Sequence, residues 1–554
     1  MWAVCCRCAD GWFTQKWLRA VYSVEQDFTE RRQEATSVGY SLRDLGAQSK
    51  FGSELKMEAI GRAVPMGVID AVLARLGVKE ERERKFTMRG VVILCIAMSL
   101  FKSGSLGAVM ENLAKGLRFV WRDPDYEVPK DSAICQRRYQ LRARPMIALF
   151  REVCRPMATP ETPGAFLFGY RLMAIDGTVE DVPDTEENEA AFGRPGSSRG
   201  ESAFPQVKGV YLVEVGTHAI VDATFWPCRT SERVGAFRVL RSVEEDMLVM
   251  GDRGLYEYDM LKAIRKRGAH ALFRMPSCVK PRYLGKLPDG SYAAYIYPGD
   301  KKRRHHGEHM LVRIIEYRVS DPAFGDPEET YRLVTTLLDW PTSAAYELAC
   351  AYHERWEIEL VIDELDTHQR LAGRPLRSRK PVGVIQELHG LLIGHYAIRY
   401  AMHESARQEG IDPDRLSFTR ALEVITRAID EFQMVSCEQQ PALYSRILRD
   451  IARRRLPERQ ARSNPRVVKQ KMSNFRRKRR EDWCPAQPER SFREMIMVVT
   501  HEEAPAQEEQ AVGSPRVGVA EVVMARSQAR ARSCQGAPDR HASRQLGRRR
   551  LSLI

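Results

Sequence analysis

Short apolar runs of strand length alternate with helical segments between residues 170 and 275, and this alternation limits the chain to few architectures. Two of the runs are joined by the short turn Gly216-Thr217-His218, which predicts an antiparallel hairpin. The predicted elements are, in order, strands at 171–175, 207–215 and 219–225, a helix at 232–245, a strand at 247–250, a helix at 258–267 and a strand at 271–275. This order predicts an α/β layered sheet.

The chain before this core has a different pattern. Residues 57–160 show apolar residues at helical spacing and predict a helical N-terminal DNA-binding domain. Its basic residues include Arg137, Arg138, Arg142 and Arg144, although a small helical bundle with a solvated basic face explains the same pattern. Residues 1–56 have weak periodicity, and we expect a poorly ordered extension there.

The chain after residue 280 divides into three further parts. Strand-like runs separated by Gly, Pro and charged residues predict a β-rich insertion at 281–338. The first part of the core is then 165–280, and its last part, with C-terminal helices, is 339–455. A single long helix is predicted at 343–369. We expect residues 456–554 to form a basic, largely disordered tail.

The charge of the chain favours a polyanionic partner. The formal net charge is +14, from 87 basic and 73 acidic residues. Residues 451–480 alone hold 13 basic residues against one acidic residue, Glu458. Double-stranded DNA is such a partner, and a solvated basic tail is the simpler alternative.

Membrane insertion and export are not predicted. The longest mostly apolar run, 91–101, is too short to span a bilayer. The N-terminus lacks the pattern of a secretory signal. We therefore expect a cytoplasmic protein with no membrane partner.

Two aspartates follow apolar runs of the predicted sheet. Asp176 closes the run at 171–175, and Asp252 follows the run at 247–250. Either carboxylate alone is explained by capping of the next turn. Together they are more informative, because neighbouring strand ends bring ligand groups to one place.

The predicted helix at 343–369 supplies a third acid. At about 100° per residue, one narrow stripe carries an aromatic ring, a guanidinium and three carboxylates: Tyr352, Arg355, Glu359, Asp363 and Asp366. An ion-paired surface face, with Arg355 bridging to Glu359, is the alternative. Asp176, Asp252 and Glu359 together would suit two Mg²⁺ ions and metal-assisted phosphoryl transfer, because Mg²⁺ prefers oxygen ligands.

These residues resemble the DDE transposases of bacterial insertion sequences, and specifically the type 4 group with its Y-(2)-R-(3)-E-(6)-K signature. The signature is read here as Tyr352, Arg355 and Glu359, with Asp366 at the last position. The segments around Asp176 and Asp252 are similar to the first and second Asp motifs of that group.

The resemblance implies a ribonuclease-H-like mixed sheet core with a β-rich insertion, holding two Mg²⁺ or Mn²⁺ ions at Asp176, Asp252 and Glu359. It implies DNA contacts from Tyr352, Arg355 and Arg253. It also implies that the N-terminal helices bind terminal inverted repeats, that the chain self-associates on DNA, and that it works at the nucleoid of a bacterium. Cleavage and strand transfer of DNA are the implied activity.

One position departs from the signature. Asp366 replaces a lysine and reverses a charge expected near DNA phosphates. A catalytically impaired DNA-binding remnant is therefore the alternative hypothesis, and a metal-dependent nuclease without strand transfer is a third.

Overall fold

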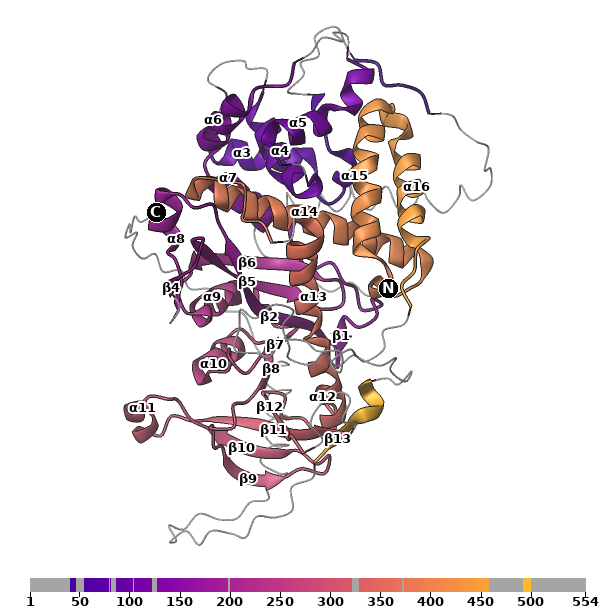
Figure 1. Cartoon of the computed structure of the whole chain (residues 1–554). Helices are drawn as coiled ribbons and strands as arrows, with labels where there is room; N and C mark the ends of the chain where they lie inside the picture. Colours follow the sequence, from indigo (N-terminus) through magenta and orange to yellow (C-terminus); the bar gives the residue numbers. More distant parts are fainter. Residues whose placement is uncertain are drawn as a thin grey trace, which may run out of the picture.

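The computed structural model describes residues 40–45, 54–78, 80, 86–102, 104–121, 127–197, 200–320, 328–370, 373–457 and 492–499. Within them, one eleven-stranded mixed sheet forms the centre of the molecule, and helices cover it (Figure 1). Residues 458–480 of the expected basic cluster at 451–480 and the expected disorder at 502–554 lie outside the described residues, as do residues 1–39 of the expected extension.

The core of the sheet is built around β2 (Tyr170–Asp181). On one side, β2 pairs with the predicted antiparallel hairpin, β5 (Gln206–Glu214) and β6 (Ala219–Pro227). On the other side, β7 (Met247–Gly251) and β8 (His270–Arg274) run parallel to it. The strand order β6-β5-β2-β7-β8 confirms the predicted ribonuclease-H-like mixed α/β core.

The strands that follow the core extend the same sheet. Four antiparallel strands continue it beyond β8, in the spatial order β12-β11-β10-β9. Their bounds are β9 (Arg282–Lys286), β10 (Tyr292–Ile296), β11 (Met310–Val319) and β12 (Tyr331–Thr335). Three of these strands lie in strand-like runs of the sequence at 292–297, 310–319 and 330–338, whereas β9 was not predicted. Periodicity did not indicate that these strands would form one sheet with the core.

Short elements complete the sheet and its surroundings. Near the C-terminus, β13 (Ile496–Val498) pairs with β11, where no regular element had been expected. The first strand, β1 (Phe166–Leu167), pairs with β2. Smaller elements are β3 (Gly196–Ser197), β4 (Gly200–Glu201), α8 (Glu186–Phe192), α9 (Glu232–Val239), α10 (Tyr258–Lys266) and α11 (Lys301–His305).

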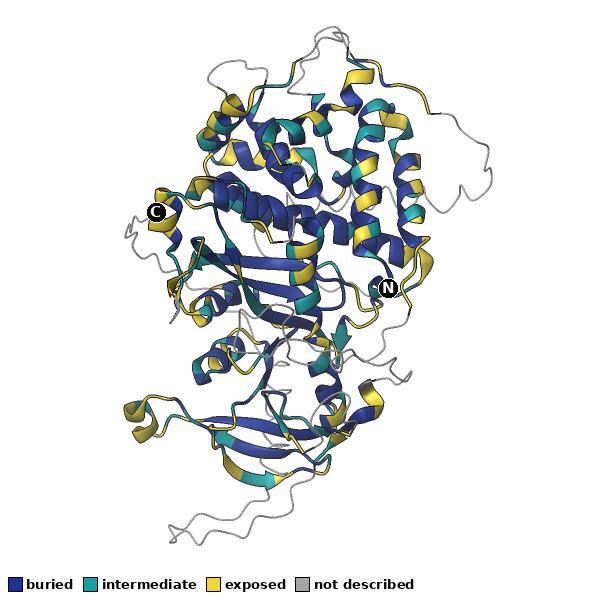
Figure 2. Cartoon of the chain, in the orientation of Figure 1, coloured by how far each residue is buried: buried dark blue, intermediate teal, exposed yellow. Residues whose placement is uncertain are grey.

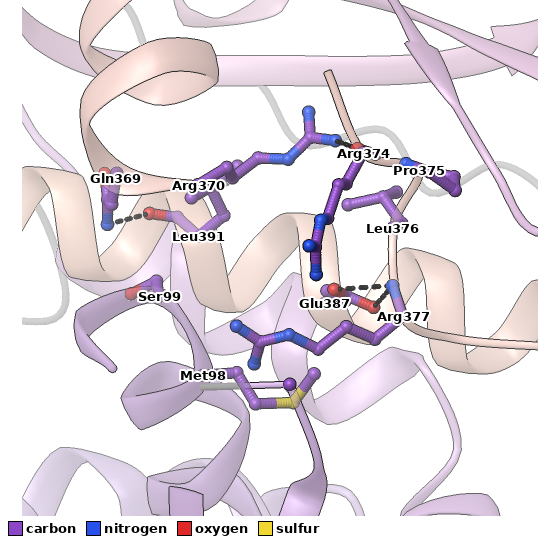
Figure 3. A pocket seen from close by; sticks show the side chains of 11 residues that line it. Met98, Ser99, Gln369, Arg370, Arg374, Pro375, Leu376, Arg377, Glu387 and Leu391 are labelled. Carbon is purple, nitrogen blue, oxygen red and sulfur yellow. Dashed lines mark hydrogen bonds between the residues drawn. The ribbon is translucent and has the colours of Figure 1, made fainter. Parts of the chain in front are cut away.

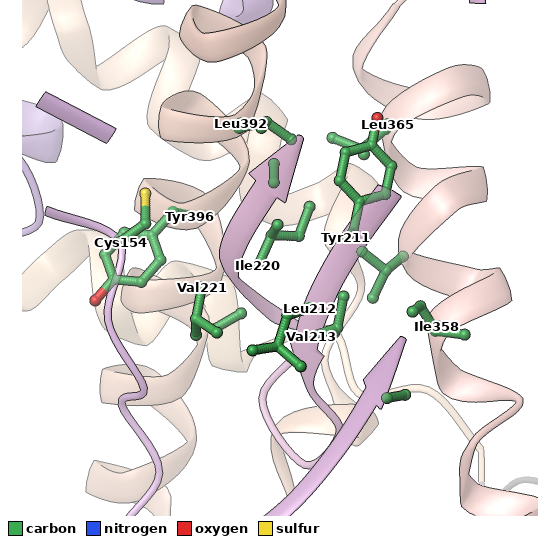
Figure 4. Packing of buried hydrophobic residues seen from close by; sticks show 14 of the residues in the cluster. Cys154, Tyr211, Leu212, Val213, Ile220, Val221, Ile358, Leu365, Leu392 and Tyr396 are labelled. Atoms are coloured by element: carbon green, nitrogen blue, oxygen red, sulfur yellow. The ribbon is translucent and has the colours of Figure 1, made fainter. Parts of the chain in front are cut away.

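Helices from both ends of the chain pack together above the sheet (Figure 1). The N-terminal helices are α3 (Met66–Arg75), α4 (Met88–Leu100), α5 (Leu106–Ala114), α6 (Asp131–Leu141) and α7 (Arg144–Val153). The C-terminal helices are α14 (Pro381–Glu409), α15 (Phe418–Met434) and α16 (Gln440–Ala452). Most side chains of α14 are buried, because α4, α7, α15 and α16 and strand β6 all contact it (Figure 2). The hairpin β5–β6 packs between α14 and the segment Glu364–Gln369. Figure 4 shows Tyr211 beside Leu365 of that segment, and Val221 beside Tyr396 of α14.

The expected basic face of the N-terminal helices is only partly present. Arg142 and Arg144 are exposed, as predicted. Arg137 and Arg138 are buried instead. Arg137 binds Glu80 at 2.7 Å, and Arg138 donates to Ser378 Oγ and to the carbonyl oxygen of Gly383, both at 3.1 Å. These two arginines join α6 to the rest of the molecule, so neither belongs to a solvated basic face.

Candidate active site

The pairing of β2 with β7 places two acidic residues side by side. The two strands are parallel, and Ile175 pairs with Gly251. Asp176 and Asp252 each follow one of these partners, so their carboxylates start from neighbouring positions of adjacent strands. Asp252 follows the last residue of β7, as predicted. The prediction that Asp176 closes its strand is wrong, because β5 continues to pair with β2 as far as Asp181.

The helix that carries the third acid is not continuous. The predicted helix at 343–369 is divided into α12 (Ala345–Glu354), α13 (Glu357–Asp363) and a π-helical segment, Glu364–Gln369. Between α12 and α13 the backbone forms tighter i→i−3 hydrogen bonds, including Arg355 N to Tyr352 O at 3.2 Å and Glu359 N to Trp356 O at 3.0 Å. Such changes of helical pitch alter which side chains share a face, and they often occur at functional sites.

Part of the predicted stripe reaches the two aspartates. Arg355 Nη1 donates to Asp176 Oδ2 at 3.3 Å, and Arg355 Nη2 lies 3.7 Å from Glu359 Oε1. The hydroxyl of Tyr352 donates to the carbonyl oxygen of Gly251 at 3.4 Å. Tyr352, Arg355 and Glu359 therefore gather with Asp176 where β2 and β7 lie side by side.

The last two members of the stripe do not reach this site. Asp363 accepts a hydrogen bond of 2.7 Å from Thr367. Asp366 lies 3.5 Å from Arg370, which also pairs with Glu180. The predicted single stripe is wrong for Asp366, because the π-helical segment from Glu364 changes the rotation per residue. Asp363 belongs to α13, like Glu359, but lies about one turn further along the helix.

The electrostatics of the site fit a bound cation. Burial raises the pKa of Asp176, and the charge of Asp252 raises it further. Burial also raises the pKa of Glu359, again helped by the charges of Asp176 and Asp252, while Arg355 opposes both shifts. Carboxylates that repel one another in a half-buried site favour a cation, and an all-oxygen donor set suits a hard divalent ion.

The other predicted DNA contacts differ in exposure. Arg253 is exposed beside Asp252, so its guanidinium is open to a ligand. Tyr352 is buried, and its hydroxyl supports the backbone at the start of the Asp252 turn.

The site lies inside a range that matches a known family. Residues 167–396 match the model described as transposase DDE domain, and residues 54–151 match the model described as insertion element 4 transposase N-terminal. The first range includes Asp176, Asp252 and Glu359. The chain belongs to the IS4-type DDE transposases.

Known relatives of this transposase carry the same description. It is 26% identical over 425 residues to transposase InsG for insertion sequence element IS4 of Escherichia coli (strain K12), covering 75% of this chain and 92% of that protein. It is 27% identical over 147 residues to the putative transposase InsZ of the same organism, covering 26% of this chain and 49% of that protein. Among solved structures, a piggyBac transposase synaptic complex with hairpin DNA is 12% identical, with a TM-score of 0.37 and coverage of 74% of this chain and 86% of that one.

Membership settles the general activity. The transposase binds DNA and cuts it in a reaction that depends on a divalent metal. Within the described part of the transposase, the helices are too short or too polar to cross a bilayer.

A buried network of charged residues, which includes Glu357 two residues before Glu359, was not predicted. His218, in the β5–β6 turn, lies 2.8 Å from Glu357 and 3.4 Å from Asp414. On the other side, Glu364 accepts from Arg399, and from His395 at 2.9 Å. The ligand atoms of His218, Glu357 and Asp414 lie within 4.8 Å of one another, close enough to share a cation. The network joins the hairpin turn, α13 and α14, but sequence periodicity cannot show it, because its members come from separate elements.

Glu232 is a second feature that sequence reasoning missed. It had been assigned only to the start of a helix. In the structure it is half-buried in the first turn of α9, and burial followed by the charges of Asp176 and Asp252 raises its pKa.

A basic pocket lies where the π-helical segment ends (Figure 3). Arg370, Arg374 and Arg377 line it, with Glu387 on the facing helix α14. The backbone N–H of Arg377 donates to both carboxylate oxygens of Glu387, at 3.0 and 3.1 Å. The pocket is lined by a different set of residues from the three acids, and it adds positive charge close to the helix that carries Glu359.

Proposed function

We propose that Asp176, Asp252 and Glu359 hold two divalent ions, Mg²⁺ or Mn²⁺, and that the transposase uses them for strand cleavage and strand transfer. One observation carries this proposal: Arg355 contacts Asp176 and Glu359, and Asp252 follows the strand position next to that of Asp176 in the β2–β7 pair. The pKa values of Asp176 and Glu359 support it. Burial raises both, and the neighbouring carboxylates raise them further, so a bound cation would stabilise the ionised forms.

The proposed reaction has two balanced displacements. In the first, the oxygen of water bonds to phosphorus at the transposon end, the P–O3′ bond breaks, and a 3′-hydroxyl and a 5′-phosphate result. In the second, that 3′-hydroxyl attacks a target phosphodiester and displaces the target 3′-oxygen. In each step the attacking oxygen loses a proton and the leaving oxygen gains one. Bound divalent ions would lower the pKa of the attacking hydroxyl and stabilise charge on the leaving oxygen.

The chain's own residues position the DNA in this proposal. Arg355, buried against the acids, offers a guanidinium that can pair with a phosphate. Exposed Arg253 extends the positive charge beside Asp252. The hydroxyl of Tyr352 donates to the backbone of Gly251, and we propose that its side chain also contacts the DNA strand.

The helices of residues 57–160 are proposed to bind the terminal inverted repeats, with exposed Arg142 and Arg144 as phosphate contacts. Self-association would pair two transposon ends, and the site of action would be the nucleoid in the bacterial cytoplasm. Mass measurement of the protein with and without end-sequence DNA tests the association.

The test of the active site is a nicking assay on DNA that carries the ends of the element. Wild type should nick it with Mg²⁺ or Mn²⁺ and not with a chelator. Glu359→Ala should abolish nicking, whereas Glu354→Ala, which removes an exposed carboxylate of the preceding helix, should not. Nicking by Glu359→Ala at the wild-type rate would overturn the assignment of that residue.

The alternative is a transposase that still binds its ends but is impaired in catalysis. Asp366 is the observation that favours it, because it puts a carboxylate where the family signature has a lysine. Supplying pre-cut ends and measuring joined product separates a full transposase from a nuclease without strand transfer. Binding of ends without nicking or joining would identify the remnant.

A further inference from the structure

A fourth carboxylate approaches the three acids from α9. This helix begins at Glu232 and packs against β2, β5 and β6. The chain reaches it directly after the hairpin, so Glu232 comes from an element that carries none of the three acids.

Gly177 shows where the carboxylate of Glu232 lies. A Cβ atom built on Gly177 would meet Glu232 Oε1 at 2.6 Å and Glu232 Cδ at 3.1 Å. The carboxylate of Glu232 therefore occupies the space next to the backbone of Gly177, the residue that follows Asp176. A side chain at position 177 would displace it.

The charges around Glu232 are mainly negative. The charges of both Asp176 and Asp252 act on its pKa, and Lys208 opposes them. The ammonium group of Lys208 also donates to the carbonyl oxygen of Thr230 at 2.7 Å, so it is shared with the backbone. Arg355 is bound to Asp176. Arg233 and Arg253 are exposed at the rim of the site, and Arg233 donates to the carbonyl oxygen of Gly254 at 2.9 Å. A cation bound among the four carboxylates would reduce the repulsion between them.

We infer that Glu232 is a fourth carboxylate of the divalent-metal site, binding a cation together with Asp176, either directly or through a bound water. This inference rests on the proposed function of Asp176, Asp252 and Glu359. It assigns the site a donor on a helix, so that the cation is held by β2, β7, α9 and α13 together.

A purely structural role makes a different prediction. A glutamate in the first turn of a helix stabilises that helix through its dipole, so its neutralisation lowers stability without metal. A carboxylate crowded by other carboxylates behaves in the opposite way, because its neutralisation relieves repulsion in the metal-free protein. The stability of the metal-free protein therefore distinguishes the two roles without an activity assay.

The experiment compares Glu232→Gln with wild type in the DNA-free full chain. Mn²⁺ binding is measured from the electron paramagnetic resonance signal of the free ion, and the melting temperature is measured with chelator and with Mn²⁺. We expect Mn²⁺ affinity to fall by about tenfold or more. The melting temperature in chelator should stay the same or rise, and the increase caused by Mn²⁺ should shrink.

The matched control is Glu186→Gln, which neutralises an exposed glutamate in the first turn of α8. It should keep wild-type Mn²⁺ affinity. Wild-type affinity in Glu232→Gln, or an equal loss in both variants, overturns the inference, as does a lower melting temperature of Glu232→Gln in chelator. If Glu232→Gln does not fold, Glu232→Asp is used instead, because it retains the charge on a side chain shorter by one methylene. Unchanged Mn²⁺ affinity in Glu232→Asp would also overturn the inference.

Failure of the proposed function is distinguishable. If the wild-type protein neither binds Mn²⁺ nor nicks DNA, the proposed metal site as a whole is ruled out. If wild type does both and Glu232→Gln is indistinguishable from it, only the assignment of Glu232 is ruled out.

Discussion

Arg355 donates a hydrogen bond of 3.3 Å to Asp176, which precedes it by 179 residues, from the turn between α12 and α13. Its other terminal nitrogen lies 3.7 Å from Glu359. One guanidinium thus joins the central strand to the helix that carries the third acid. It also balances part of their negative charge before DNA or metal is bound.

Replacement of Arg355 by Met should shift the pH dependence of nicking. Arg355 lowers the pKa of both Asp176 and Glu359, so both pKa values should rise without it. The acid limb of the pH–rate profile should then move to higher pH, and the maximal rate should fall by roughly a hundredfold. The measurement is the nicking rate from pH 5 to 9, with Arg267→Met, at an exposed position, as control. An unchanged acid limb would mean that Arg355 does not set the ionisation of the acids.

Protonated His218 should stabilise the protein at neutral pH. Burial and Arg399 lower its pKa, but the carboxylates of Asp414, Glu357 and Glu364 outweigh them and raise it to about 9. Since the pKa is about 6.5 in the unfolded chain, this contribution is complete below pH 6.5 and is lost as pH rises through 9. A pKa difference of this size corresponds to a stabilisation of about 3 kcal/mol.

The test is denaturant unfolding of wild type and His218→Asn between pH 6 and 9.5. Asparagine tolerates the positive φ of 60° at this position. The variant should be less stable at pH 6 and should lose less stability than wild type as pH rises. His305→Asn, at an exposed position, should follow wild type. Parallel curves for wild type and His218→Asn would exclude the charged form of His218.

Gly390 should be essential to the packing of α14 on α4. A Cβ atom at Gly390 would lie 2.2 Å from the carbonyl oxygen of Cys95, and a backbone atom cannot swing aside. Gly390→Ala should lower the free energy of unfolding by about 1–3 kcal/mol. Gly67→Ala, in α3 with open space around it, should be neutral or slightly stabilising. Equal stability of the two variants would show that α4 and α14 are not in close contact.

Asp366 should limit strand processing if the loss of a phosphate contact is the only damage. Burial, and then Glu180, raise the pKa of Asp366 to about 8, so it lies in a site that disfavours negative charge. Asp366→Lys would restore a cation beside Glu180, and it should increase joining of pre-cut ends. Asp363→Lys, an exposed change three residues earlier, should not. No gain from Asp366→Lys would point to impairment elsewhere in the chain.

The local pattern of the sequence was enough to predict the core strands. Runs of two-residue and 3.6-residue periodicity located β2, β5, β6, β7 and β8, and Asp176 and Asp252 follow neighbouring positions of β2 and β7, in line with the expectation that strand ends bring them together. The same reasoning failed where structure depends on distant partners. The length of β2 is set by β5, and the burial of Arg137 and Arg138 is set by segments far along the chain.

The changes of helical pitch around α13 could not be predicted from the sequence for a related reason. A constant rotation per residue placed Asp366 in the same stripe as Glu359, but the helical turns are tighter before α13 and wider after it. Glu232 carried no signal of its own, because its neighbour Gly177 is 55 residues earlier in the chain and reveals it only after folding.

The continuous sheet has a mechanical consequence. Because β9 to β12 are hydrogen-bonded onto β8 rather than carried on a hinged domain, a side chain on β9 is held six strand spacings from β2, or about 29 Å. The outer edge of the molecule is thus a rigid arm whose reach is fixed by backbone geometry. The sheet therefore fixes the distance between the active site and any ligand bound at that outer edge. Adding or deleting one strand would change this distance by about 5 Å.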